Sequence, residues 1–105
     1  MALRLSETKR VVIVAEQALE EQLLDEAVKL GAKGWTLDHC SGKGKHTIME
    51  DPFAEPDRSR VRIEILCTAP VAEAILHRLD GAPYNARGVL GYMDTVMVSD
   101  RRTFA

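Results

Sequence analysis

Glycines alternate with basic residues in one segment of the chain, which reads Ser41-Gly42-Lys43-Gly44-Lys45-His46. Glycine lets backbone N–H groups turn toward an anion, and the lysines add positive charge. The G-x-x-x-x-G-K-[ST] spacing of a phosphate-binding P-loop is missing, as is the helix that would follow it. The segment therefore predicts either an anion site or a solvated, flexible hairpin tip.

Two further basic clusters lie next to the last predicted strand. Asn85-Ala86-Arg87-Gly88 leads into that strand, and Arg101-Arg102 follows it. A lone arginine on a loop is usually a solvated charge. Guanidinium forks combined with glycine amides, however, match phosphate or carboxylate. We therefore expect an anion site, and the three clusters meet most easily across a subunit boundary.

An acidic residue, Glu64, shares one face of a predicted strand with Arg60 and Arg62. Alternate residues of a strand point to the same face, and here that face is opposite the apolar one. Glu64 either forms an ion pair with a neighbouring strand, which contributes little to stability if exposed, or accepts a hydrogen bond from a base amine or a ribose hydroxyl.

Residues for catalysis or metal binding are scattered. The candidates are His39, His46, His77, Cys40 and Cys67. The cysteines lack C-x-x-C spacing, so we expect them to be buried in the core. A metal site would require the loop to bring Asp38, His39 and His46 together. The sequence thus favours a binding module over an enzyme and predicts no metal site.

Composition narrows the class of protein. The 105 residues predict one domain, 1–105, and the net charge of −2 argues against nucleic-acid binding. No apolar run approaches the roughly 20 residues of a membrane span, and the start lacks the apolar core of a signal peptide. We therefore expect no membrane insertion and a cytoplasmic location.

The elements that must position these residues alternate along the chain. Hydrophobic periodicity predicts strands over 9–15, 34–40, 60–67 and 89–98, helices over 16–30 and 70–80, loops over 41–59 and 82–88, and a basic tail over 99–105. Two consecutive β-α-β units of this length predict an α+β, ferredoxin-like βαββαβ sandwich.

The first strand is apolar on both faces, with Val11 and Ile13 on one and Val12 and Val14 on the other. Such a strand belongs in the middle of a sheet that is covered on both sides. The helices of one small domain can cover only one side. We therefore expect another subunit to cover the other.

Taken together, these segments resemble the PII signal-transduction superfamily, most closely the PII-like proteins associated with bicarbonate uptake and carboxysomes. The resemblance spans residues 9–102 and is carried by Gly34-Trp35-Thr36, Gly42-Lys43-Gly44-Lys45-His46-Thr47 and Val61-Arg62-Ile63-Glu64-Ile65. It implies a homotrimer with three intersubunit clefts for adenine nucleotides and a T-loop at about 42–59. It also implies that Gly42, Gly44 and Lys45 contact phosphate, with Glu64 in the base pocket.

The chain departs from this family at several positions. In the phosphate-binding B-loop, here Ala86-Arg87-Gly88-Val89, only Gly88 matches and Val89 replaces a lysine. That change favours ADP or AMP over ATP. The T-loop lacks the tyrosine that is nucleotidylylated in other members, and Arg101 and Arg102 correspond only loosely to the C-terminal arginines of the family.

The favoured interpretation is a non-enzymatic sensor whose T-loop changes order to control a partner such as a bicarbonate transporter. The expected nucleotide-binding residues are Gly42, Lys43, Gly44, Lys45, Glu64, Arg87, Gly88, Arg101 and Arg102. Bicarbonate is expected at Lys45, Arg58 and Arg60, unless acidic residues of the loop neutralise these charges. An acylphosphatase-like phosphohydrolase and a trimeric metal-tolerance or structural protein of the same fold remain alternatives.

Overall fold

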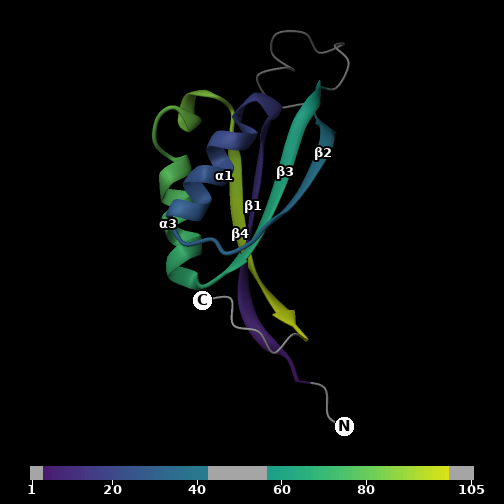
Figure 1. Ribbon diagram of the computed structural model, residues 1–105, viewed down its shortest axis with the longest axis vertical. Coiled ribbons are helices and arrows are strands. Elements are labelled where there is room, and N and C mark those ends of the chain that lie inside the picture. Colours follow the sequence, from purple (N-terminus) through teal and green to yellow (C-terminus); the bar gives the residue numbers. More distant parts are fainter. Residues whose placement is uncertain (1–3, 43–56, 100–105) are drawn as a thin grey trace.

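The computed structural model describes residues 4–42 and 57–99, and two helices cover one face of a four-stranded sheet (Figure 1). The strands are β1 (Ser6–Glu16), β2 (Thr36–Gly42), β3 (Asp57–Cys67) and β4 (Leu90–Val98). The helices are α1 (Glu20–Lys29) and α3 (Ala69–Leu79), with short 3₁₀ turns η1 (Gln17–Leu19) and η2 (Tyr84–Ala86). The strand order β2-β3-β1-β4, antiparallel throughout, confirms the ferredoxin-like prediction.

The core lies between the sheet and the helices. β1 contributes Val11, Ile13 and Ala15, and β3 contributes alternate residues from Val61 to Cys67. Close packing also explains one glycine. A Cβ on Gly91 would lie 2.6 Å from Leu79 Cδ1, so a larger residue at this point would require the Leu79 side chain on α3 to move.

Several predicted boundaries were wrong. The first helix begins at Glu20 rather than Glu16, because Glu16 is still extended (φ −67°, ψ 146°) and ends β1. The first strand is longer than its apolar run, because pairing with β4 continues down to Ser6 opposite Val98. The predicted loop 82–88 contains η2. The first two differences arise because backbone pairing of β1 continues past its hydrophobic pattern.

The strands also extend into the predicted loop 41–59. β2 continues to Gly42, which lies opposite Asp57 at the start of β3, with a register shift after Cys40. Residues 43–56 lie outside the described part of the chain. At its other end, β2 begins at Thr36 rather than Gly34, and Trp35 is exposed.

A second subunit is not needed to cover Val12, contrary to the prediction. β1 is central, as predicted, yet Val12 is only 1% exposed within a single chain. Its neighbours on the helix-free face are Glu64 of β3 and Tyr92 of β4, so side chains of adjacent strands cover it. The exposed apolar surface of this face lies on β4, where Leu90 is 55% and Tyr92 45% exposed.

Candidate functional site

One end of the sheet brings together three of the predicted anion-binding residues, Gly42, Arg60 and Arg87. In the strand pairing, Arg60 of β3 lies opposite Glu16 of β1 on one side and opposite Cys40 of β2 on the other. Cys40 is two residues before Gly42 in the chain. A Cβ on Gly42 would lie 3.5 Å from Arg60 Cδ, so the arginine side chain lies against this glycine. We call Gly42, Arg60, Arg87 and Glu16 the basic end.

Arg87 reaches the basic end from a different part of the chain. It follows η2, and its guanidinium donates a hydrogen bond to the Glu16 carboxylate and forms an ion pair with it. The next residue, Gly88, has a φ of +67°, a left-handed conformation that glycine adopts at no steric cost. The chain therefore turns into β4 directly after Arg87.

Packing beneath η2 fixes the position of Arg87. Tyr84 is fully buried, and burial raises the pKa of its hydroxyl. The Arg78 guanidinium lies 4.9 Å from the centre of the Tyr84 ring, and its Nε forms an ion pair with Glu26 of α1 at 2.6 Å. The Arg87 N–H donates to the Tyr84 carbonyl at 3.0 Å. An aromatic anchor thus ties this arginine to the core.

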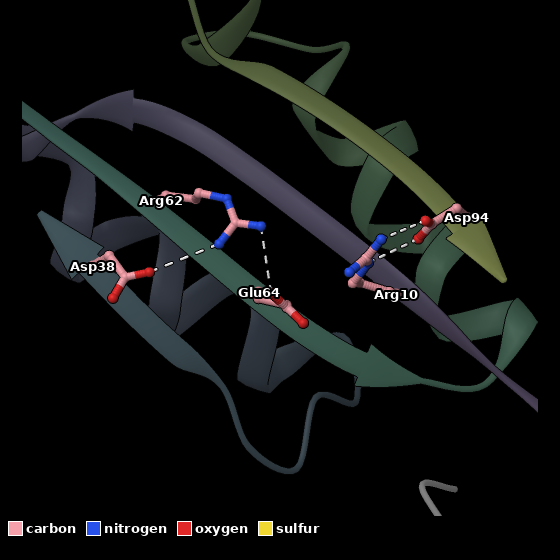
Figure 2. Close-up of polar contacts among 5 residues, drawn as sticks. All are labelled: Arg10, Asp38, Arg62, Glu64 and Asp94. Atoms are coloured by element: carbon pink, nitrogen blue, oxygen red, sulfur yellow. Dashed lines mark hydrogen bonds and ion pairs between the residues drawn. The ribbon is translucent and has the colours of Figure 1, made fainter. Parts of the chain in front are cut away.

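A second charged group lies on the helix-free face of the sheet (Figure 2). Glu64 accepts from Arg62 of its own strand at 3.4 Å, and Arg62 also lies 3.7 Å from Asp38 of β2. Both distances exceed the 2.7–2.9 Å that is usual for charge-assisted hydrogen bonds. The sequence predicted for Glu64 either an ion pair with a neighbouring strand or a contact with a nucleotide. The structure shows a long ion pair, and its partner, Arg62, is on the same strand.

Sequence reasoning missed the other members of this group, Arg10 of β1 and Asp94 of β4. Arg10 donates two hydrogen bonds to the Asp94 carboxylate, from Nε at 2.9 Å and from Nη2 at 2.6 Å. The hydrogen bond lowers the pKa of Asp94 and raises that of Arg10. No motif marks this pair, because strand pairing joins residues 84 positions apart.

Asp38, Arg62, Glu64, Arg10 and Asp94 together form a charge row that crosses all four strands with alternating sign (Figure 2). Glu64 also contributes to raising the pKa of Arg10, although the two are not hydrogen-bonded partners in the row. The charge row thus contains Glu64, a predicted ligand contact, together with side chains that hold Glu64 on the sheet face.

Several predicted site residues cannot be placed. Lys43, Gly44, Lys45, Arg101 and Arg102 lie outside the described residues. Arg58 belongs to β3, but its side chain is not described. β2 and β4 are the two edges of the sheet, and β4 ends at Val98, at the opposite end from Gly42.

The cysteines and histidines give a mixed result. Cys67 is buried as predicted, and burial raises the pKa of its thiol. Cys40 is only half-buried, because it lies on the helix-free face opposite Arg60. His77 is exposed on α3, and His39 forms a pair with Glu20 at 3.1 Å. Residues 4–42 and 57–99 contain no cluster of three potential metal ligands, and none of their helices could cross a membrane.

Comparison with known families connects this geometry to a class of proteins. Residues 8–103 match the family described as nitrogen regulatory protein P-II. The chain belongs to the P-II family. A solved structure described as a PII-like signaling protein, from Thermus thermophilus, is 33% identical over 90% of each chain, with a TM-score of 0.73. A comparison with curated proteins gives no match.

Two more distant P-II relatives share the fold. CPII, a nitrogen regulatory PII-like protein from Thiomonas intermedia bound to ADP, AMP and bicarbonate, is 24% identical over 94% of each chain, with a TM-score of 0.77. The GlnK–ATP complex of B. subtilis is 22% identical, covers 89% of this chain and 83% of its own, and has a TM-score of 0.52. The chain is therefore a PII-like regulatory protein, and proteins of this family are regulatory rather than enzymatic.

Proposed function

We propose that residues 1–105 form one PII-like domain, which assembles as a trimer and binds ADP or AMP in the clefts between subunits. The observation that carries this proposal is the basic end, where Gly42, Arg60 and Arg87 lie together although they come from distant parts of the chain. The bound ADP and AMP of the CPII structure support the choice of ligand.

The basic end is the proposed phosphate site. The described charged side chains there are two guanidiniums and one carboxylate, so positive charge remains for an anion. Arginine binds phosphate through parallel N–H donors, and glycine allows backbone amides to approach it closely. Lys43, Gly44 and Lys45 directly follow Gly42 in the sequence, and Gly88 directly follows Arg87. We assign these four residues to the same site.

The charge row is the proposed site for the rest of the nucleotide. Glu64 is partly exposed, and its contact with Arg62 is long, so its carboxylate is able to accept from a base amine or a ribose hydroxyl. The ligand would then extend along the sheet face from the basic end. Arg101 and Arg102 follow the opposite end of β4, and we assign them to the cleft through a neighbouring subunit.

Bicarbonate is the proposed second ligand, held by Lys45, Arg58 and Arg60. A nucleotide with few phosphates leaves part of the positive charge at the basic end unneutralised. A small planar anion accepts hydrogen bonds from a guanidinium fork and from amides. Binding of both ligands would change the order of the predicted T-loop between β2 and β3 and so present a surface to a partner, such as a membrane transporter.

Calorimetric titration of AMP, ADP and ATP, each with and without tens of millimolar bicarbonate, tests this function. We expect ADP and AMP to bind, and bicarbonate to tighten ADP binding by the same factor as ADP tightens bicarbonate binding. Chloride at equal ionic strength is the control. Failure of all three nucleotides to bind would overturn the proposal, and an unchanged ADP affinity would remove bicarbonate from it. Sedimentation tests the trimer, which a monomeric mass at micromolar concentration would contradict.

A further inference from the structure

We propose that Glu16 is a specificity-determining residue, which pairs with Arg87 and thereby favours ligands that carry few phosphates. This inference rests on the proposed function, because that function assigns Arg87 to a phosphate group. It adds a residue that sequence reasoning placed at the start of a helix rather than in any site. The structure places Glu16 at the end of β1, within the basic end.

The geometry of the pair supports this role. Glu16 accepts a hydrogen bond from the Arg87 guanidinium and lies opposite Arg60 in the β1–β3 ladder. It is thus positioned between the two described arginines of the basic end. A carboxylate offers a guanidinium the same kind of paired oxygen acceptors as a phosphate does. Glu16 therefore takes the place beside Arg87 that the proposed function gives to a phosphate.

A purely structural role explains this pair less well. Arg87 is already positioned by the buried ring of Tyr84 and by its own backbone hydrogen bond to the Tyr84 carbonyl. The side chains of Arg87 and Glu16 are 45% and 36% exposed, and exposed ion pairs contribute little to stability. The fold therefore does not depend on the pair, whereas an anion that enters the basic end must compete with it.

Competition at Arg87 makes the effect of Glu16 depend on ligand charge. A phosphate that takes Arg87 displaces the carboxylate and leaves its negative charge nearby. The resulting repulsion increases with the charge of the phosphate chain, so it is smallest for AMP and largest for ATP. Glu16 thus disfavours ATP, independently of the lysine that Val89 replaces in the B-loop.

The test is calorimetric titration of AMP, ADP and ATP into the native protein and Glu16→Gln. Glu73→Gln is the matched control, because it makes the same charge change at an exposed position on α3. We expect Glu16→Gln to tighten ATP binding by about threefold to fivefold, ADP less and AMP least, as exposed ion pairs allow. Glu73→Gln should leave the ratio of ATP to AMP affinity unchanged.

Two further variants separate competition from a simple change of charge. Glu16→Asp keeps the charge but withdraws the carboxylate from Arg87 by one methylene, so it should show part of the gain for ATP. In an Arg87→Ala background, Glu16→Gln should gain less, because no guanidinium is released. An unchanged affinity ratio in Glu16→Gln, or an equal gain in Glu73→Gln, would overturn this inference while nucleotide binding itself stands. Failure of the native protein to bind any of the three nucleotides would overturn both.

Discussion

The charge row and the basic end use the same kinds of side chain but differ in the balance of their charges. In the charge row, acids and arginines alternate across four strands, and the Arg10–Asp94 pair is held by two hydrogen bonds. In the basic end, two arginines face one described carboxylate, with a glycine beneath Arg60. The charge row thus holds three carboxylates and two guanidiniums and has no positive charge left for an anion, whereas the described side chains of the basic end have an excess of one positive charge beside a glycine.

The largest effect is expected from the packing beneath the basic end. Tyr84→Ala removes a fully buried ring and should lower the free energy of unfolding by about 3–5 kcal/mol. The charge row lies on the other face of the sheet and needs no contact with this ring. Tyr84→Phe, which keeps the ring, is the control and should retain most of the stability. Urea denaturation measures both, and a loss below about 1 kcal/mol for Tyr84→Ala would contradict the anchoring role.

The next effect separates the two regions by charge. Arg87→Ala should weaken ADP binding by about tenfold to a hundredfold and adenosine binding much less, since a charge-assisted contact contributes about 1.5–3 kcal/mol. Arg10→Ala removes the same charge from the charge row and should leave the difference between ADP and adenosine unchanged. Calorimetry measures both ligands. Equal losses of ADP and adenosine in Arg87→Ala would mean that this residue acts on folding rather than on phosphate.

A smaller effect is expected at the charge row. Glu64→Gln should weaken adenosine, AMP and ADP by a similar factor of about twofold to tenfold, because one hydrogen bond to the base or ribose is lost. Arg87→Ala, in contrast, should weaken ligands that carry phosphate much more than adenosine. Competition binding with a fluorescent nucleotide measures the three ligands together. A loss that grows with the number of phosphates would place Glu64 at the basic end instead.

The smallest effect concerns stability in acid. The pKa of Asp94 in the folded protein is lowered from 3.8, first by its hydrogen bond with Arg10. Its stabilising contribution is therefore present above about pH 4 and is lost as the pH falls through the lowered pKa. Asp94→Asn should reduce stability at neutral pH and converge with the native protein in acid. Unfolding curves from pH 6 to pH 2 measure this, and a constant difference over that range would contradict it.

Local sequence patterns were sufficient for the architecture and for the buried faces. Alternation in Val61-Arg62-Ile63-Glu64-Ile65 separates the core face of β3 from its charged face, and the structure confirms both. The stripe through Leu19, Leu23 and Ala27 likewise marks the buried side of η1 and α1. Such patterns are readable because the repeats of strand and helix are local properties of the chain.

The candidate site was only partly predictable. The sequence singled out Gly42, Arg60 and Arg87 by composition, and the structure places them at one end of the sheet. It gave no sign that Glu16 would join them, because its apparent place in a helix hid its position at the end of β1. Acidic residues are common at the start of helices, so the charge of Glu16 did not mark it as a site residue.

The sequence by itself determined the family, the order of the elements and the residue types at the basic end. Each of these can be inferred from residues that are close together in the chain. Tertiary structure alone decided which charges meet. Arg87 and Glu16 are 71 residues apart, and their contact depends on how the segment after α3 packs over the end of β1. The cover over Val12 was decided in the same way, by the registers of β3 and β4. Strand register is fixed by packing across the whole sheet, which no local stretch of sequence contains.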